Sequence, residues 1–425
     1  MKAEIKQLIN QLNNGEVPSG YEKMEIGTFP IGWKITTLDK LLDFKNGVNA
    51  DKEKYNSGVK MISVMDILTD TPILYDSIKG QVDIDEKTLD IYSVTYGDIL
   101  FQRSSETVED AGKSNVYLDP DKTATYSGFV IRGKKKAEYN PYFLNEALRI
   151  GQVRSQIMRS AAGSQHINVG QDSLAKIIVP IASSDEQSKI AKILMKWDEA
   201  IELQEKLIDK IVIKNNNYAN KLLSQKTNWK PMPLSKFIEL KSGYAFKSES
   251  YTEEGKYKII TIKNVKSGEL DLSEYSVIDC LPNNIQSHQI LNIGDIIISL
   301  TGNVGRACII TSENCLLNQR VGKINVKNIN PTFIYEILKT KRFISKMQNI
   351  SQGCAQANLS NDDVENFIAF FPIKNDALDV ETIDKISNFL GTLQKELNFQ
   401  KEILNYLVAQ RKALQQYLLN GIARV

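Results

Sequence analysis

The sequence predicts an α+β protein in which two tandem α/β domains are joined by two long antiparallel coiled-coil helices, with a pseudo-twofold internal repeat. Three observations predict this fold. The chain repeats itself at an offset of about 196 residues. Each copy begins with short strand-like segments separated by Gly, Asn and Ser clusters. Each copy also ends in an apolar stripe with the spacing of a long helix.

The repeat consists of short motifs that occur in the same order in both halves of the chain. The matching pairs are Trp33-Lys34 with Trp229-Lys230, Gly97-Asp98-Ile99-Leu100 with Gly294-Asp295-Ile296-Ile297, and Asn140-Pro141 with Asn330-Pro331. Matches that stay collinear while their offset drifts slightly indicate two diverged copies of one unit of roughly 200 residues.

Each copy starts with a mixed segment of strands and helices. The strand-like runs are 60–64, 98–102 and 177–179 in the first copy, and 258–262 and 295–300 in the second. Asn140-Pro141 and Asn330-Pro331 place Asn at an N-cap and Pro at the first helical position. We therefore expect helices over 144–158 and 334–347, and these caps explain both motifs without any chemistry.

A long helix closes each copy, because apolar residues recur alternately four and three positions apart over 190–222 and 386–418. The seam includes Leu194, Trp197, Ile201 and Ile208 in the first helix and Leu390, Leu397, Leu404 and Leu407 in the second. Both seams carry polar residues at the same two positions, Gln204 with Gln400 and Asn215 with Arg411. About 36 residues at ~1.5 Å each make a rod on the order of 54 Å, which is longer than a compact core needs. We expect the two helices to be each other's partners; the alternative is a pair of plain core-facing helices.

These elements predict five segments along the chain. They are an N-terminal helix and lead-in over 1–29, a first domain over 30–180, a first spacer helix over 183–225, a second domain over 229–373 and a second spacer helix over 379–421.

The composition excludes several classes of function. The 425 residues include 53 Lys+Arg and 51 Asp+Glu, and a net charge of +2 excludes DNA or membrane affinity driven by bulk charge. Two histidines, His166 and His288, are too few for a multi-histidine metal centre. The four cysteines show no Cys-x-x-Cys spacing, so we expect no bound metal and no disulfide framework. The apolar runs are too short to span a bilayer, and we expect a cytoplasmic protein without membrane contacts.

Two motifs resemble catalytic elements without completing them. Gly112-Lys113-Ser114 resembles the end of a phosphate-binding loop, but Thr107 stands where that loop needs a glycine. Asn140-Pro141-Tyr142-Phe143 resembles the Asn-Pro-Pro-Tyr loop of amino-methyltransferases but has one proline instead of two. The sequence therefore contains no persuasive catalytic constellation.

The order of the motifs resembles one protein family over essentially the whole chain. The motifs are Trp33-Lys34, Gly97-Asp98-Ile99-Leu100, Asn140-Pro141-Tyr142-Phe143, Gly163-Ser164-Gln165 and Glu186-Gln187, followed by the seam helix and then the repeat of the series to Tyr417-Leu418-Leu419-Asn420-Gly421. This doubled order resembles the specificity (S) subunit of type I restriction-modification enzymes. The second copy departs from it at Asp379-Val380-Glu381-Thr382, which lacks the Gln of Glu186-Gln187.

The resemblance implies a non-catalytic DNA-recognition and scaffolding subunit. The two α/β domains would be target-recognition domains, each reading one half of a bipartite, asymmetric site in double-stranded DNA. The helices would set the gap between the halves and dock two modification (methyltransferase) subunits, which restriction (translocase and nuclease) subunits join. This chain would bind no cofactor, because S-adenosylmethionine belongs to the modification subunits and ATP with Mg²⁺ to the restriction subunits.

Two other functions remain open from the sequence. One is a fused restriction and methylation enzyme that acts alone, against which the missing methyl-donor and nuclease motifs argue. The other is a structural coiled-coil adaptor, which would bind every duplex with the same affinity at fixed salt.

Candidate DNA contacts lie in loops that follow strands, where polar and basic side chains suit base edges or phosphates. In the first domain they are Gln102, Arg103, Ser104, Lys113, Arg132, Gln165 and His166, and in the second they are Thr301, Asn303, Arg306 and Gln356. For each residue the alternative is an ordinary solvated loop position. Arg132 belongs to the basic run 132–136, which suits phosphates better than bases.

Overall fold

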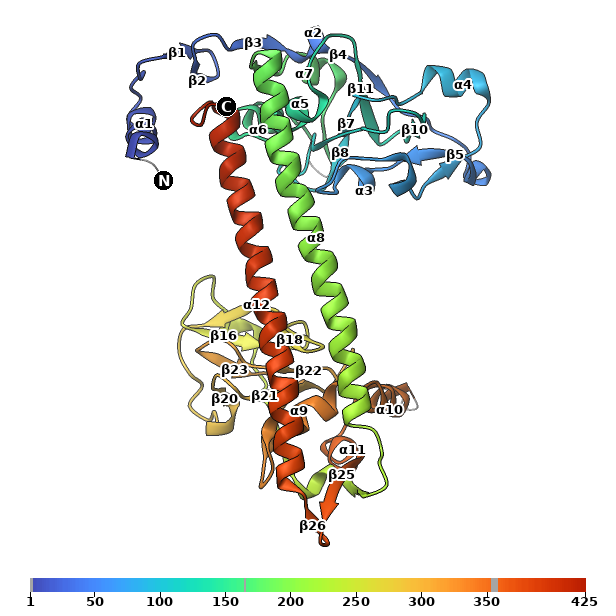
Figure 1. The fold of residues 1–425 in the computed structure, drawn as a ribbon, viewed down its shortest axis with the longest axis vertical. Coiled ribbons are helices and arrows are strands. Elements are labelled where there is room, and N and C mark those ends of the chain that lie inside the picture. Colours follow the sequence, from blue (N-terminus) through green and yellow to red (C-terminus); the bar gives the residue numbers. More distant parts are fainter. Residues whose placement is uncertain (1–2, 164–165, 353–357) are drawn as a thin grey trace. The chain divides into compact units, whose positions relative to one another are not determined.

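The computed structural model describes residues 3–163, 166–352 and 358–425. The chain forms two compact units, shown as a ribbon in Figure 1. Unit 1 comprises Met1–Gln204 with Ile403–Val425, and unit 2 comprises Glu205–Glu402. Each unit contains one mixed α/β domain and a stretch of both long helices.

The centre of unit 1 is a four-stranded antiparallel sheet. Its strand order is β4 (Leu42–Asn46), β11 (Val130–Lys135), β7 (Ile99–Gln102) and β9 (Ser114–Val116). Ile131 of β11 lies opposite Asn46 on one side and Phe101 on the other. The four residues of β7 are all buried because the sheet is covered on both faces. Residues 98–102 were therefore predicted correctly as a strand.

Smaller sheets and helices surround this centre. The strands are β1 (Tyr21–Met24) with β2 (Gly27–Pro30), β3 (Lys34–Thr37) with β13 (Ile178–Ile181), β5 (Tyr55–Ile62) with β6 (Gln81–Val82) and β10 (Thr125–Tyr126), and β8 (Ser104–Ser105) with β12 (Ile167–Asn168). The helices are α1 (Ala3–Asn13), α2 (Leu38–Leu41), α3 (Val64–Ile67), α4 (Glu86–Ile91), α5 (Pro141–Ala147), α6 (Gly151–Ser160) and α7 (Gln171–Ala175).

Unit 2 repeats the central sheet with the same order and strand directions. Its strands are β15 (Ile238–Ser242), β24 (Val321–Val326), β21 (Ile296–Ser299) and β22 (Ala307–Ile309). The others are β14 (Trp229–Pro233), β25 (Ile368–Lys374) and β26 (Ala377–Leu378), then β19 (Ser276–Ile278), β16 (Tyr257–Ile260), β23 (Cys315–Leu317) and β20 (Ile290–Leu291), and β17 (Val265–Lys266) with β18 (Glu269–Leu270). Its short helices are α9 (Pro331–Lys339), α10 (Lys341–Gln352) and α11 (Asn361–Glu365).

The expected helices 144–158 and 334–347 are each divided in two, and this part of the prediction was wrong. Asn140 and Asn330 do cap α5 and α9, with Pro at the first helical position. The first helix ends before Ile150, which is extended and fully buried, and Gly151 follows. The second ends at Thr340, whose extended backbone lets its hydroxyl accept the amide of Phe343. Burial and local capping thus outweigh the continuous helical pattern.

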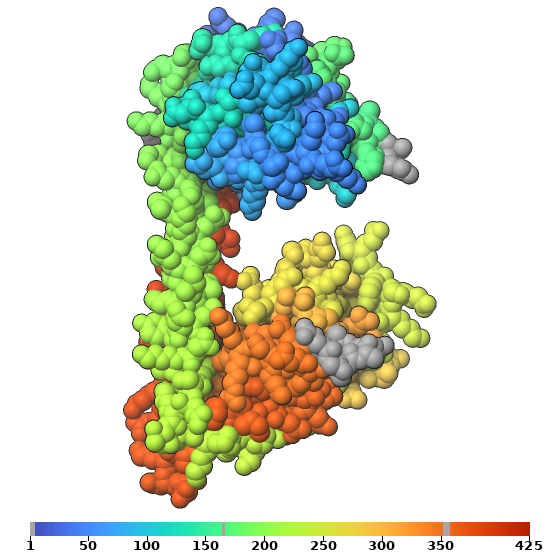
Figure 2. All heavy atoms as spheres, turned by 90° about the vertical axis from the view of Figure 1, so that its right-hand side faces the viewer, coloured from blue at the N-terminus to red at the C-terminus, as the bar shows by residue number. Residues whose placement is uncertain are grey.

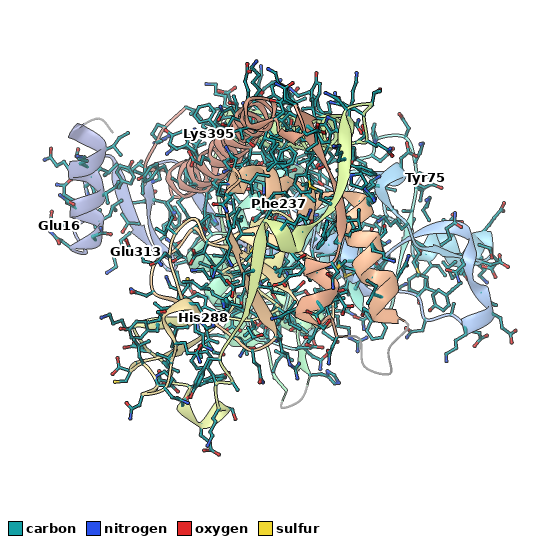
Figure 3. The ribbon with its side chains drawn as sticks, turned by 90° about the horizontal axis from the view of Figure 1, so that it is seen from below. Glu16, Tyr75, Phe237, His288, Glu313 and Lys395 are labelled. Carbon is teal, nitrogen blue, oxygen red and sulfur yellow. The ribbon has the colours of Figure 1, made fainter. Side chains whose placement is uncertain are left out.

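The repeated tryptophans anchor the two cores. Trp33 stacks on Phe29 and meets Phe143 edge-on, with ring centroids 5.9 and 6.3 Å away. In unit 2, Trp229 packs on Phe333 at 6.2 Å. Figure 3 labels Phe237, whose ring lies 4.4 Å from that of Phe371 in the same core. Large aromatic rings bury much apolar area and prefer such tilted contacts, which explains why this motif recurs.

The two long helices are α8 (Ser184–Leu222) and α12 (Val380–Leu419), of 39 and 40 residues. Within unit 1, Asp198 pairs with Arg411, while Glu186 earlier in α8 pairs with Arg424 in the segment that follows α12. Within unit 2, Asn215 contacts Leu393, and the ring of Tyr218 lies 5.6 Å from that of Phe389. In both units a higher residue number in α8 meets a lower one in α12, so the helices run antiparallel.

The seam side chains differ in burial along the helices. Leu194, Ile208, Leu390 and Leu397 are buried, whereas Trp197, Ile201, Leu404 and Leu407 are half-buried. Other apolar side chains of α8, Leu203 and Ile213 among them, lie open to solvent; the helix is drawn in green atoms in Figure 2.

Candidate nucleic-acid interface

One edge of the central sheet in unit 1 gathers four loops. β4 and β7 end at this edge and β11 begins there, because neighbouring strands are antiparallel. Backbone hydrogen bonds join the loops: the Arg103 amide donates to the Phe129 carbonyl at 3.0 Å, and the Val169 amide donates to the Arg103 carbonyl at 3.0 Å. The Gly128 amide donates to the Val48 carbonyl at 2.8 Å. We call the loops around residues 46–49, 102–105, 127–129 and 168–173 the strand-end surface of unit 1.

Unit 2 builds an equivalent surface with the same backbone pattern. The Leu300 amide donates to the Arg320 carbonyl at 3.0 Å, and the Leu359 amide donates to the Leu300 carbonyl at 2.8 Å. The Gln319 amide donates to the Tyr244 carbonyl at 2.9 Å. These bonds match those of unit 1 one by one, so the strand-end surface of unit 2 comprises the loops around residues 242–245, 299–302, 318–320 and 358–361.

The candidate residues that follow β7 lie on or beside the strand-end surface of unit 1. Gln102 is buried and its side-chain amide donates to the Ser104 carbonyl. Arg103 is half-buried and its Nη1 donates to the Gly128 carbonyl at 3.3 Å. The Ser104 hydroxyl donates to Asn168 Oδ1 at 2.5 Å, and the Lys113 ammonium pairs with Asp110. The structure thus groups Arg103 and Ser104, while Gln102 lies beneath them.

Arg132 does not lie on this surface, and the prediction that it faces DNA was wrong. Only 5% of the residue is exposed, and its guanidinium donates to the Ser93 carbonyl and lies over the ring of Tyr126. It occupies the strand position that Lys323 holds in unit 2, where Lys323 pairs with Asp295 at 2.5 Å. The repeated Gly-Asp-Ile motif therefore places an aspartate beside a cation within each fold.

Two of the candidate residues of unit 2 share one cavity. Asn303 and Arg306 line a cavity of about 410 Å³ together with Asn264, Asp271 and Glu274. Arg306 is equivalent to Lys113 of unit 1. The Arg306 carbonyl accepts the Ser299 amide, and in unit 1 the Lys113 carbonyl accepts the Gln102 amide in the same way. Thr301 lies apart from these two, bridged to Asn358, and its hydroxyl oxygen is buried with no hydrogen-bond partner among the described residues.

Gln165 and Gln356, two further candidates, lie outside the described residues. His166 is exposed, and its carbonyl accepts a hydrogen bond from Asn168 Nδ2 at 3.1 Å. The second histidine, His288, is labelled in Figure 3; its Nε2 lies 3.1 Å from the Ser242 carbonyl, which belongs to the strand-end surface of unit 2.

The sequence reasoning missed a buried polar network in unit 1 that joins the domain to α12. Glu146 is 1% exposed, and its carboxylate pairs with Arg411 Nη2 at 2.7 Å and accepts Gln415 Nε2 at 2.8 Å. Arg411 Nε also pairs with Asp198 at 2.8 Å. Arg411 stood out in the sequence as a cation in an apolar seam, and that anomaly was the signal for a buried partner.

A similar ion pair holds the segment that follows α12. The Arg424 guanidinium bonds Glu186 Oε1 at 2.7 Å, and the same carboxylate accepts Trp33 Nε1–H at 2.9 Å. These contacts give the buried Glu186 carboxylate its partners and tie the Trp33 motif to the start of α8. Charge-assisted hydrogen bonds of this kind are stronger than neutral ones.

Within residues 3–163, 166–352 and 358–425, no group of three or more His, Cys, Asp or Glu side chains is placed to hold a metal ion. Over the same ranges, each helix is too short or too polar to cross a membrane.

Comparisons with known proteins give one consistent result. The family model described as "Type I restriction modification DNA specificity domain" matches this chain twice, over residues 30–212 and 226–405. The chain is 22% identical over 434 residues to the putative type I restriction enzyme MjaX specificity subunit of Methanocaldococcus jannaschii, covering 95% of this chain and 97% of the relative. It is 24% identical over 277 residues to the MjaVIII specificity subunit of the same organism, covering 59% and 63%.

Two solved structures share the fold over nearly the whole chain. The S subunit of a type I restriction-modification system from M. genitalium aligns with a TM-score of 0.52 and 18% identity, covering 92% of this chain and 96% of that one. A chain from a study of complex assembly and conformational transition of the type I R-M system aligns with a TM-score of 0.55 and 13% identity, covering 93% and 99%. These similarities confirm the predicted α+β fold with two tandem domains and long helices.

Proposed function

Because this chain belongs to the family of type I restriction-modification DNA specificity domains, we propose that each of its two recognition domains reads one half of a split, asymmetric site in double-stranded DNA. The chain is the specificity subunit of a type I restriction-modification system, as the order of its motifs predicted.

The observation that carries the proposal is that the two strand-end surfaces share a backbone but not their side chains. Equivalent hydrogen bonds place Lys113 with Arg306, Gly128 with Gln319, and Phe129 with Arg320. A common scaffold presents a different set of chemical groups in each unit, which suits two readers of different half-sites. Base contacts depend on side-chain identity, whereas phosphate contacts only position the protein.

The chain itself is non-catalytic in this proposal, and the chemistry belongs to partner subunits. Two modification subunits would dock on α8 and α12, whose outward faces carry exposed apolar residues at Leu203, Ile213, Phe399 and Tyr406. Large apolar side chains gathered on an exposed face are typical of protein interfaces. The modification subunits would hold S-adenosylmethionine, and restriction subunits with ATP and Mg²⁺ would complete the enzyme.

The test is to purify the chain with its cognate modification subunits and to sequence the sites that the complex methylates in genomic DNA. A split, two-part motif is expected, and its absence would overturn the proposal. DNA cleavage by the isolated chain with Mg²⁺ would indicate an enzyme instead. Equal affinity for every duplex at fixed salt would indicate a structural adaptor.

Two variants test whether each domain reads its own half-site and whether the long helices set the gap between the halves. Exchanging residues 30–180 for the corresponding domain of a relative should change one half of the motif and leave the other half unaltered. Inserting one helical turn near residue 205, with a matching turn in α12, adds about 5.4 Å and should lengthen the gap between the halves. A domain exchange that alters both halves together would show that the readers are not independent.

A further inference from the structure

Phe129 and Arg320 occupy the same backbone position in the two units. Each is the last residue before the strand at the centre of the sheet, β11 or β24, and its carbonyl accepts the amide of the residue that follows β7 or β21. The turn before each strand is closed by the same bond, from Val130 to Ser127 at 2.9 Å and from Val321 to Asn318 at 2.8 Å. One turn therefore presents a phenylalanine in unit 1 and an arginine in unit 2.

Close backbone packing holds this turn in place. At Gly47 an added Cβ would meet the Ser127 carbonyl oxygen at 2.1 Å, and at Gly243 it would meet the Asn318 carbonyl oxygen at 2.2 Å. Only glycine permits the preceding loop to approach so closely. Because the turn is hydrogen-bonded on both sides, the backbone that carries Phe129 or Arg320 is held in a fixed position.

Both side chains are exposed and chemically suited to reading bases. Phe129 is 66% exposed although its neighbours Tyr126 and Val130 are fully buried. Arg320 is exposed, follows the exposed Gln319, and has its amide bonded to Asn318 Oδ1 at 3.2 Å. In the described part of the chain, no carboxylate lies within ion-pair distance of the Arg320 guanidinium.

The arginine of each surface stands at a different backbone position in the two units. Unit 1 has Arg103 beside Phe129, and unit 2 has Leu300 beside Arg320, with the same amide-to-carbonyl bond joining each pair. Each pair thus combines one arginine with one large apolar side chain in exchanged positions, although Leu300 is buried whereas Phe129 is exposed. Such an exchange preserves a cation at the surface and moves the hydrogen-bond donors to a different place.

We propose that this position determines sequence specificity in each recognition domain, with Arg320 contacting a guanine and Phe129 contacting a thymine methyl group in the major groove. Arginine donates two parallel hydrogen bonds to O6 and N7 of guanine, and phenylalanine packs on the C5 methyl group of thymine. The inference rests on the proposed function, because it requires that the strand-end surfaces face DNA.

The experiment uses the full chain assembled with its modification subunits and a randomised duplex library, with methylated sequences read out. Arg320→Ala should lower the preference for guanine at one position of one half-site by about 5- to 150-fold, with the other half and the gap unchanged. Arg320→Gln should move that preference towards adenine, because glutamine pairs with N6 and N7 of adenine. Phe129→Ala should weaken a thymine preference in the other half.

Lys236→Ala is the matched control, because this exposed cation precedes β15 at the opposite end of the sheet. It should leave the motif unchanged. An Arg320→Ala motif identical to the wild type, or a uniform loss of methylation on all sequences, would overturn the inference, since uniform loss is the signature of a phosphate contact. Absence of any split motif for the wild-type complex would instead overturn the proposed function.

Discussion

Replacing Arg411 with methionine is expected to destabilise unit 1, because Arg411 neutralises a carboxylate that the fold has removed from water. Glu146 is buried under α12, and its Oε2 lies 2.7 Å from Arg411 Nη2. Burial alone would lower the pKa of Arg411, but the charges of Glu146 and Asp198 and the hydroxyl of Tyr142 raise it above its usual range. Arg411 therefore stays charged at every accessible pH, and methionine removes that charge while retaining an apolar chain of similar length.

The size of the effect follows from what remains around Glu146. Removing one partner of a buried ion pair costs about 3–5 kcal/mol of unfolding free energy, because the other charge is left uncompensated. Arg149 lies 3.3 Å from Glu146 and Gln415 still donates to it, so we expect the lower end, about 3 kcal/mol. For a unit of roughly 200 residues this lowers the melting temperature by about 6–12 °C.

Differential scanning calorimetry of the full chain measures this shift. Lys401→Met is the control, since Lys401 pairs with Glu269 in unit 2 and both side chains are solvent-exposed. It should cost less than about 1 kcal/mol. The Arg411→Met/Glu146→Gln double variant should recover part of the loss, because no uncompensated charge remains at Glu146. Effects of the two single changes that add within about 0.5 kcal/mol would refute the reasoning, because residues in contact are expected to couple.

Three further outcomes are expected. Burial raises the pKa of Asp98, although its carboxylate accepts hydrogen bonds from backbone amides. The native state therefore binds this proton at a higher pH than the unfolded state does, and the contribution of Asp98 to stability grows as the pH falls through the native pKa. An NMR titration of its carboxyl carbon with a midpoint in the ordinary range would contradict this. Burial raises the pKa of the Cys308 thiol to about 12, whereas Cys280 is exposed, so alkylation of the native protein at pH 8 followed by peptide mapping should modify Cys280 well before Cys308. Asn140→Ala removes the side-chain acceptor for the Phe143 amide at the start of α5 and should cost about 0.5–2 kcal/mol in urea unfolding, a loss that Asn140→Ser should largely restore.

Much of the fold was predictable because repetition and periodicity are properties of the chain alone. The repeated Trp, Gly-Asp-Ile and Asn-Pro motifs predicted two copies of one unit, and the 3.5-residue spacing predicted the two long helices. Local chemistry was predictable for the same reason, since Asn140 caps α5 through a bond to a residue only three positions away.

Long-range contacts were not predictable, because no pattern in the sequence shows which residues distant in the chain will meet in the fold. Arg132 belongs to a basic run and was expected to face DNA, yet the neighbouring strands and the Tyr126 ring bury it. The division between α5 and α6 depends on the burial of Ile150, which overrules the helical pattern. The division between α9 and α10 is local by contrast, since the Thr340 hydroxyl accepts the Phe343 amide, but the continuous apolar pattern concealed it.

The candidate site shows the same division between local and tertiary information. Composition and motif order were sufficient to recognise a specificity subunit with two recognition domains. The near-neutral net charge and the two diverged copies can both be seen in the amino-acid sequence. That Phe129 and Arg320 share one position was visible only in the structure. The segments from β7 to β11 and from β21 to β24 differ in length, and hydrogen bonds between residues far apart in the chain place both side chains at the same point of the sheet.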